Sequence, residues 1–298
     1  MVLVVGATGN LGFSICTELT RRGHPLRAVV RPSSDPGRVK ALGHLRAEPV
    51  PADLKDPASL ERACQGVDTV ITTATTTLRD QRADSIADVD LQGGLNLVEA
   101  ARRAGVGRYI FVSFPEAADG PQPFPLAQAK RAVERAWRHS GLRGVILQAG
   151  IFMEFWLSPA VGFDAHNATA RVAGDGAAPI PWVSLRDVAR AAAACLEHPE
   201  WDGTLRVLAE QLSMNGVIEV FGEVGGRRLT TQTIPQPVLD AQRLAASTPL
   251  DQSFAGLMQA MARGVPMTPD ARLAELHSTF TTVHSHAWSV MLALAAST

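Results

Sequence analysis

Short apolar runs alternate with helical stripes along the first half of the chain. The runs lie at Val2–Val5, Leu26–Val30, Val67–Ile71 and Tyr109–Val112. Between them, apolar residues recur every three or four positions, most clearly over Leu11–Leu19, Leu91–Ala101 and Leu126–Ala136. This alternation predicts βαβ units, in which helices cover both faces of a parallel sheet. Gly141–Leu147 is expected to supply a sixth strand.

The pattern changes after Gly150, where Ile151–Trp156 is rich in aromatic residues and Ala170–Val183 is interrupted by Gly and Pro. A helix over Leu185–Leu196 and a strand over Gly203–Leu208 then form one more α/β unit. Further helical stripes lie near Asn215–Phe221, Val238–Ala246, Ser253–Arg263 and Thr282–Leu294. We therefore predict an α/β chain with a doubly wound sheet domain over residues 1–150, to which 184–209 return. A smaller, mostly helical substrate lobe is expected over residues 151–183 and 210–298.

A glycine-rich turn, Gly6-Ala7-Thr8-Gly9-Asn10-Leu11-Gly12, follows the first strand directly. Its first glycine allows a tight turn, its second leaves room for a pyrophosphate beside the backbone, and its third lets the helix pack on the strand. The free N–H groups at the start of that helix suit phosphates. In this strand–turn–helix context, Gly6, Thr8, Gly9, Asn10, Leu11 and Gly12 predict a Rossmann-type dinucleotide site. A structural turn in another α/β protein is the alternative.

The end of the second strand bears on which dinucleotide binds. Arg31 there carries a planar donor fork that suits a 2′-phosphate, whereas an acidic residue near this point typically holds a ribose hydroxyl. Because of Arg31 we expect NADP(H) to be preferred, and because Asp35 is close by, NAD(H) is the alternative. After the third strand, Asp53 and Leu54 either border the adenine or belong to the turn before the next helix.

Composition narrows the class of protein. The chain has 298 residues, a net charge of −1, 46% hydrophobic residues and 19% charged residues. That balance argues against direct nucleic-acid binding and against a polybasic membrane surface. Three scattered cysteines are too few for a disulfide framework or a zinc cluster, so we expect a reducing, cytoplasmic location and no metal. The apolar tail, Trp288–Ala296, falls short of the ~20 residues of a membrane span.

These motifs resemble the atypical short-chain dehydrogenases/reductases, especially the NmrA-like branch with its isoflavone reductase-like and quinone reductase-like members. The resemblance covers residues 1–210 and is loose in the C-terminal lobe. Besides the glycine turn, the matching residues are Arg31, Asp53-Leu54, Val89-Asp90 through Asn96, Gly105-Val106, Ser113, Lys130, Ile151-Phe152-Met153-Glu154 and Pro181 through Asp187-Val188-Ala189.

For catalysis, the resemblance implies a role for Lys130. Most members of the wider superfamily carry a tyrosine four residues before this lysine, but Leu126 stands there, and the chain's single tyrosine, Tyr109, lies in a predicted strand. In the family the lysine contacts the nicotinamide ribose, and in isoflavone reductase-like members it serves as the acid/base. We predict that Lys130 contacts the cofactor and donates the proton, and that Ser113 binds a substrate oxygen. The alternatives are a surface lysine paired with Glu134 and a serine that only caps its strand.

Two further groups complete the predicted site. Thr73 and Ala74, after the fourth strand, are expected to contact the cofactor. An apolar substrate pocket is expected from Phe152, Met153, Phe155, Trp156 and Trp182. Apolar walls with few polar groups suit a planar substrate, although ordinary core packing is the alternative for each residue.

Two functions of different classes follow. The first is an NADPH-dependent oxidoreductase that reduces a small hydrophobic carbonyl, enone or quinone without the usual catalytic tyrosine. The second is an NmrA-like regulatory protein that senses NADP(H) and binds a protein partner, with little or no catalysis. Lys130 and the aromatic segment favour the first, and the missing tyrosine favours the second. An epimerase or dehydratase ranks third because that chemistry uses the same tyrosine. A homodimer or a regulatory protein partner is expected, and a membrane partner is not.

Overall fold

The computed structural model describes residues 1–77 and 81–296, which fall into two compact units. Unit 1 comprises Met1–Ser113, Pro125–Gln148 and Val188–Leu205. Unit 2 comprises Phe114–Phe124, Ala149–Asp187 and Arg206–Thr298. The glycine turn, Lys130 and Ser113 therefore belong to unit 1, and the predicted aromatic pocket residues belong to unit 2.

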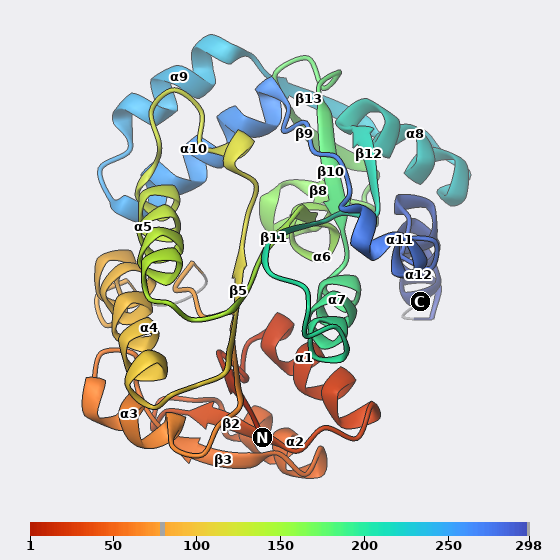
Figure 1. The fold of residues 1–298 in the computed structure, drawn as a ribbon. Coiled ribbons are helices and arrows are strands. Elements are labelled where there is room, and N and C mark those ends of the chain that lie inside the picture. The colour runs from red at the N-terminus through yellow and green to blue at the C-terminus, as the bar shows by residue number, and fades with distance from the viewer. Residues whose placement is uncertain (78–80, 297–298) are drawn as a thin grey trace. The chain divides into compact units, whose positions relative to one another are not determined.

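Unit 1 is built on a sheet in which the described strands follow the order β11-β6-β5-β4-β1-β2-β3 (Figure 1). Their bounds are β1 Val2–Val5, β2 Leu26–Val30, β3 Glu48–Pro51, β4 Thr69–Thr72, β5 Arg108–Ser113, β6 Gly144–Ala149 and β11 Gly203–Val207. Because β1 pairs in parallel with both β2 and β4, the two halves of the sheet grow outward from β1 in opposite directions. The reversal creates a switch point at the carboxyl ends of β1 and β4, where open α/β sheets bind ligands.

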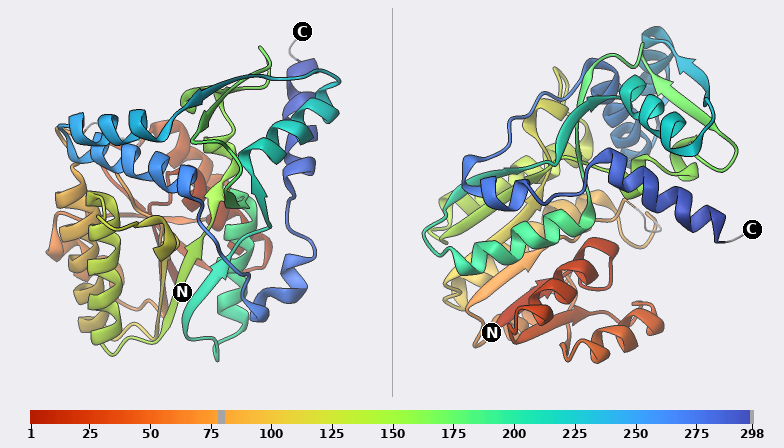
Figure 2. Two further views of the ribbon diagram at one scale, coloured as in Figure 1. Left: turned by 90° about the horizontal axis from the view of Figure 1, so that it is seen from above. Right: turned by 90° about the vertical axis from the view of Figure 1, so that its right-hand side faces the viewer.

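Helices cover both faces of this sheet, as Figures 1 and 2 show, with α3, α4 and α5 on one face and α1 and α7 on the other. Their bounds are α1 Asn10–Arg21, α2 Pro36–His44, α3 Pro57–Cys64, α4 Gly94–Arg103, α5 Pro125–His139 and α7 Leu185–Glu197. The side chains of Asp35 and Asp56 cap α2 and α3, and each is followed by a proline that suits the first helical position. The predicted doubly wound, Rossmann-type fold is confirmed.

Some element bounds differ from those predicted. The strand expected over Gly141–Leu147 is β6, Gly144–Ala149, because Ser140 and Gly141 form the turn that follows the preceding helix. The strand expected over Val67–Ile71 is β4, Thr69–Thr72. The helix expected over Leu91–Ala101 begins with a π-helical segment, η1, Ile86–Gly93, which is capped by Ser85 and runs into α4.

Unit 2 contains helices at each predicted place and also two small sheets. The sheets have the orders β12-β10-β7 and β13-β9-β8 in the described ranges. Strand bounds are β7 Ile151–Phe152, β8 Phe163–Asp164, β9 Thr169–Ala173, β10 Pro179–Val183, β12 Glu210–Ser213 and β13 Thr230–Ile234. Helix bounds are α6 Met153–Trp156, α8 Met214–Gly225, α9 Gln236–Ala245, α10 Pro249–Arg263, α11 Ala274–His277 and α12 Val283–Ala295. Short 3₁₀ turns lie at η2 Glu116–Ala118, η3 Pro159–Val161 and η4 Ala271–Leu273.

Candidate cofactor-binding and catalytic site

In the glycine turn, Gly6 and Gly12 lie where the backbone approaches other atoms too closely for a side chain, as the sequence predicted. Gly6 has a φ of +86°, and a Cβ there would lie 2.8 Å from Thr73 Oγ1. A Cβ on Gly12 would lie 2.1 Å from the Gly6 carbonyl oxygen, so only glycine lets α1 pack this closely on the turn. The turn closes through a hydrogen bond that the Gly9 N–H donates to the Gly6 carbonyl at 3.0 Å.

The start of α1 fits a pyrophosphate. Gly9 is the N-cap residue, and no side chain caps the helix there. A Cβ on Gly9 would meet only the Gly6 carbonyl oxygen, at 3.3 Å, so the exposed position leaves a cradle that a side chain would fill. The first N–H groups of a helix carry its positive dipole end and bind anions. The backbone N–H groups of Asn10 and Leu11, directly after Gly9, are therefore suited to hold phosphate oxygens.

The segment after β4 borders this turn. The Thr73 N–H donates to the Val5 carbonyl at 3.0 Å, which extends the β1–β4 pairing past the end of β4. Ala74 N would lie 3.0 Å from a Cβ on Gly6, so both residues pack directly against the glycine turn. Their position at the switch point is where the sequence predicted them, although their contact with a cofactor stays a prediction.

The predicted ribose side of the site is a cluster of two cations and two carboxylates. Arg31 Nη1 donates to both carboxylate oxygens of Asp84, at 3.1 and 2.9 Å, and lies 4.0 Å from Asp53 Oδ2. Lys55 Nζ donates to the same Asp84 at 2.9 Å. Burial raises the pKa of the Asp84 carboxyl, but the hydrogen bonds from Lys55 and Arg31 outweigh burial and hold the pKa below its usual range. A 2′-phosphate would therefore compete with Asp84 for Arg31.

Asp53 has a turn role of its own. Its carboxylate accepts from the Lys55 N–H at 2.9 Å, and its own N–H donates to Ser59 Oγ at 3.0 Å. Leu54 is buried in the core of unit 1. Asp35, which kept NAD open as the cofactor, uses its carboxylate to cap α2 by accepting from the Arg38 N–H at 2.8 Å. These bonds are the local turn and cap contacts that Asp favours.

A second arginine, which the sequence analysis did not single out, lies beside the turn. Arg38 Nη2 donates to Asn10 Oδ1 at 2.7 Å, and its guanidinium lies 5.2 Å from the centre of the Phe13 ring. Arg38 lies in the first turn of α2, the helix that follows α1 and β2 in the chain. One signal in the sequence could have pointed to Arg38: it is a basic residue in the first turn of the helix that Asp35 caps after β2. Arg38 therefore joins Arg31 as a candidate phosphate ligand.

Lys130 is buried rather than on the surface, which contradicts the alternative of a surface lysine paired with Glu134. Its side chain is 8% exposed, and Nζ donates to the Ala74 carbonyl at 3.5 Å. Nζ also lies 4.9 Å from the centre of the Phe111 ring and 4.0 Å from Asp90 Oδ1. Burial lowers the pKa of Lys130, against the opposing effects of the Asp90 and Glu134 charges.

Ser113, at the end of β5, belongs to a buried polar group on α5. Its Oγ donates to Glu134 Oε1 at 2.5 Å, and Arg131 donates to the same carboxylate oxygen. The Glu134 side chain is fully buried. The hydroxyl proton of Ser113 is directed at Glu134, and Arg131 Nη1 donates to the serine oxygen at 3.3 Å, so toward any further group this oxygen acts as an acceptor. The predicted contact of Ser113 with a substrate stays a prediction.

The five aromatic and apolar residues predicted as a pocket wall differ in exposure. Met153, Trp156 and Trp182 are buried in the core of unit 2, and Trp182 Nε1 donates to the Leu212 carbonyl at 2.9 Å. Phe152 and Phe155 are half-buried. The first three therefore hold unit 2 together, whereas the last two retain surface that could face a ligand.

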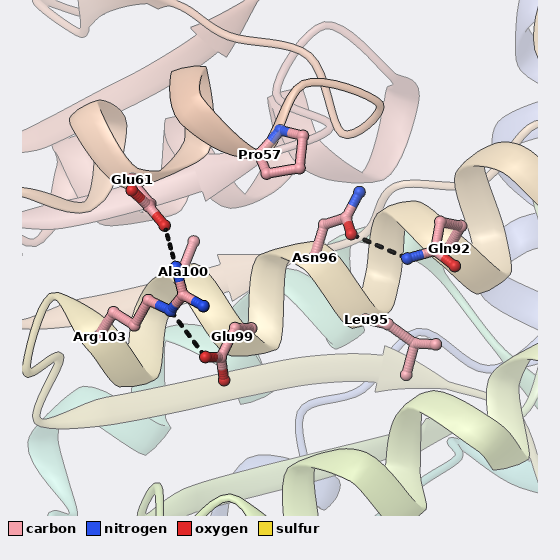
Figure 3. A pocket seen from close by; sticks show the side chains of 8 residues that line it. All are labelled: Pro57, Glu61, Gln92, Leu95, Asn96, Glu99, Ala100 and Arg103. Carbon is pink, nitrogen blue, oxygen red and sulfur yellow. Dashed lines mark hydrogen bonds and ion pairs between the residues drawn. The ribbon is translucent and has the colours of Figure 1, made fainter.

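A groove of about 380 Å³ lies between α3 and α4 of unit 1 (Figure 3). Its lining residues are Pro57, Glu61, Gln92, Leu95, Asn96, Glu99, Ala100 and Arg103, none of which is a predicted site residue. Figure 3 shows Arg103 paired with both Glu61 and Glu99, at 2.9 and 2.7 Å. Since two carboxylates of the groove already bind the guanidinium of Arg103, we assign no ligand to the groove.

Over residues 1–77 and 81–296, no three or more His, Cys, Asp or Glu side chains are grouped so as to hold a metal ion. Over the same ranges, no helix combines the length and the apolar character that crossing a bilayer requires.

Comparison with known sequences finds a match to the NmrA-like family over residues 1–286. The chain is 31% identical over 247 residues to the photosystem II assembly factor Ycf39 of Synechocystis sp., a match that covers 81% of this chain and 73% of that protein. It is 25% identical over 297 residues to an NAD(P)H azoreductase of Xenophilus azovorans, which covers 93% of this chain and 98% of that protein.

Comparison with solved structures finds the same fold. The triphenylmethane reductase of Citrobacter sp., in complex with NADP(H), aligns with a TM-score of 0.77 and 20% sequence identity. The alignment covers 98% of this chain and 100% of that chain. At this level of identity, the likeness establishes the fold.

Proposed function

The chain belongs to the NmrA-like family, and from this premise we propose that it is an NADPH-dependent reductase of a small hydrophobic acceptor. The observation that carries the proposal is a buried ammonium group, Lys130 Nζ, bound to the carbonyl of Ala74, a residue that packs against the glycine turn. A reductase needs a dinucleotide site and a proton source at one edge of its sheet. Unit 1 offers candidates for both.

We assign the cofactor to residues of unit 1. The N–H groups at the start of α1 would hold the pyrophosphate, and Arg31 and Arg38 would hold the 2′-phosphate. Lys130 would contact the nicotinamide ribose. When bound, NADPH supplies a hydride, while the residues of this chain bind it, orient it and provide a proton. Two arginines near the turn favour NADP(H), and the competition from Asp84 for Arg31 limits that preference.

Lys130 is the proposed proton donor. Burial lowers its pKa, so the ammonium gives up a proton more readily than an exposed lysine does. In the proposed step, an N–H bond of Lys130 breaks, and the proton joins the oxygen of the acceptor as that oxygen gains negative charge. The neutral amine then regains a proton from water.

The acceptor is proposed to be a planar, conjugated molecule: a carbonyl, enone or quinone, or a dye with a similar electron-accepting system. The names of the azoreductase and the triphenylmethane reductase support this class, since azo and triphenylmethane compounds are typically rich in aromatic rings. In unit 2, the half-buried rings of Phe152 and Phe155 are candidate contacts for such a molecule.

A second candidate function is an NADP(H)-binding regulatory or assembly protein with little catalysis. Leu126 is buried at the position where the wider superfamily carries its tyrosine, and Ser113 directs its proton at Glu134. The relative that bears an assembly-factor name adds to this reading. A homodimer or a regulatory protein partner, and a cytoplasmic location, stay predictions.

Two measurements on the same preparation decide between the candidates. Calorimetry measures NADPH and NADH binding, and absorbance follows NADPH oxidation with a panel of quinones, enones, aldehydes and azo dyes. A reductase binds NADPH and oxidises it steadily with at least one acceptor. Tight NADPH binding with no oxidation across the panel supports the regulatory function, and no binding of either dinucleotide removes both candidates.

A further inference from the structure

Asp90 is a buried carboxylate between Lys130 and the segment that follows β4. Its side chain is fully buried. Oδ2 accepts two hydrogen bonds from Thr76, one from the N–H at 3.1 Å and one from Oγ1 at 2.8 Å. Oδ1 lies 4.0 Å from Lys130 Nζ and accepts no hydrogen bond from the described residues. One oxygen thus anchors the backbone after β4, and the other faces the lysine.

The local backbone brings this carboxylate to the lysine. Asp90 lies in the π-helical segment η1, and π-helical turns are frequent at functional sites. Directly after η1, a Cβ on Gly94, the first residue of α4, would lie 2.5 Å from Val133 Cγ2, so glycine allows the junction of η1 and α4 to approach α5 closely. Val133 is one helical turn beyond Lys130 on α5, and the close approach therefore falls beside the lysine.

We propose that Asp90 is a positioning residue for Lys130: it holds the ammonium group, charged, against the Ala74 carbonyl beside the glycine turn. This inference rests on the proposed function, because it gives Lys130 its orientation toward the cofactor edge of the sheet. The same carboxylate fixes Thr76, so it ties the lysine and the segment Thr73–Thr76 into one rigid group.

The charged groups around Lys130 support the role of Asp90. The charged groups that face Lys130 are Asp90 from η1, and Glu134 and Arg131 from α5 itself. Glu134 is already bound by Ser113 and Arg131. Glu134 Oε2 lies 3.7 Å from Arg138 Nη1, so Glu134 faces two arginines, whereas Asp90 faces Lys130 alone among the described cations. Asp90 is therefore the counter-ion of the ammonium group, and a buried cation without a counter-ion is strongly disfavoured.

The test measures Lys130 directly and needs no substrate. The chain contains three lysines, at positions 40, 55 and 130, so isotope-labelled lysine gives a simple NMR spectrum that Lys40→Arg and Lys55→Arg assign. We compare the wild-type protein with Asp90→Asn, in which the amide oxygen can still accept from Thr76. The expected result is at least a tenfold increase in the acid dissociation constant of Lys130, with Lys40 and Lys55 unchanged. An unchanged Lys130 titration overturns the proposal.

A matched variant separates this role from simple anchoring. Thr76→Val removes the hydroxyl hydrogen bond to Asp90 but keeps the carboxylate, so the titration of Lys130 should stay close to that of the wild type. If Asp90→Asn does not fold, the double variant Asp90→Asn/Lys130→Met should fold, because it removes both buried charges together. Failure of the double variant as well would show that an unpaired buried charge is not what prevents Asp90→Asn from folding, which contradicts the proposal.

Activity provides a separate readout. If an acceptor is found, the basic limb of the pH–rate profile should move to lower pH in Asp90→Asn, by the same amount as the Lys130 titration. A limb that stays in place while the Lys130 titration moves means that Lys130 is not the proton donor. That outcome removes the proposed mechanism and leaves the pairing of Asp90 with Lys130 intact, so the two failures can be told apart.

Discussion

At the scale of single residues, two glycines of the glycine turn, Gly9 and Gly12, differ in how much room they leave for a side chain. Gly9 has a φ of −76° and a ψ of 166°, a conformation that any residue adopts. Gly12 is different, because a Cβ there would overlap the Gly6 carbonyl. The two glycines therefore predict different outcomes for the same substitution, one on binding and the other on folding.

We expect Gly9→Val to lose NADPH binding by about 100-fold or more while the protein stays folded, because the side chain fills the proposed phosphate cradle. Calorimetry gives the affinity, and circular dichroism checks the fold. Gly43→Val in α2, where a Cβ meets nothing within 4 Å, is the matched control and should bind normally. Gly12→Val should fail to fold. Undiminished NADPH binding by Gly9→Val would remove the assignment of the turn.

Arg31 and Asp84 predict opposite effects on cofactor choice. Arg31→Ala should weaken NADPH by about 10- to 100-fold, the value of a hydrogen bond between charged groups, and should change NADH little. Asp84→Asn should strengthen NADPH relative to NADH, because it removes the carboxylate that holds Arg31 at 2.9 Å. The ratio of the two dissociation constants, measured by calorimetry for each variant, is the readout. Equal losses for both dinucleotides in Arg31→Ala would show that Arg31 does not discriminate.

At the scale of elements, α1 is tied to the rest of unit 1 by charges at its far end. Glu18 accepts from Arg21 Nε at 2.9 Å and from Arg22 Nε at 2.8 Å, and Arg22 also donates to Glu197 of α7 at 2.6 Å. The hydrogen bond from Arg21, joined by the contacts with Arg22, lowers the pKa of Glu18 to about 2. Glu18 thus links the helix that carries the phosphate turn to α7 through a shared arginine.

This shift predicts a pH-dependent contribution to stability. Because the folded-state pKa of Glu18 lies below its unfolded value, the ionised form stabilises the fold fully above about pH 4.5, and that stabilisation is lost as pH falls through about 2. Glu18→Gln should lower the free energy of unfolding by about 1–2 kcal/mol at pH 7. Urea titrations between pH 2 and 7 should show the difference from the wild type shrinking toward zero at the acid end. A constant difference would contradict the prediction.

The helices of unit 1 also show which features the hydrophobic pattern of the sequence can predict and which it cannot. The stripes over Leu11–Leu19 and Leu126–Ala136 predicted α1 and α5 because both helices bury one face on the sheet. The π-helical start of α4 escaped prediction, since eight residues are too few to separate its period from that of an α-helix. The partner of Arg31 escaped as well: Asp84 lies 53 residues away, and only the folded sheet brings the two together.

At the scale of the whole molecule, the pattern predicted the parallel sheet of unit 1 better than the sheets of unit 2. Parallel strands buried on both faces leave continuous apolar runs such as Val2–Val5. In unit 2, β13 pairs with β9, matching Thr230 with Thr169, but the residues of β13 are mostly exposed and polar. A strand of that kind leaves no apolar run in the sequence, so the sheet depends on contacts that the pattern does not record.

Lys130 connects the burial of one side chain to the function of the molecule. Replacing it alone would leave Asp90 as an uncompensated buried charge, so the informative variant is Lys130→Met combined with Asp90→Asn. If Lys130 donates the proton, kcat should fall by about 10²–10⁴, a much larger change than the loss of NADPH affinity that follows from its ribose contact. The basic limb of the pH–rate profile should also vanish, because methionine does not titrate. Burial lowers the lysine pKa, so that limb should lie below the range of an exposed lysine in the wild type.

The exposed Lys40 supplies the control, because no role in the site is assigned to it. Lys40→Met should therefore leave both kcat and the pH profile unchanged. A regulatory protein predicts something else: no acceptor turns over before or after the change, and only NADP(H) affinity responds. An active protein whose double variant keeps its kcat would mean that water or another group protonates the acceptor. In that case the buried ammonium would serve to bind the cofactor. Another proton source would then replace the tyrosine that the wider superfamily carries where this chain has Leu126.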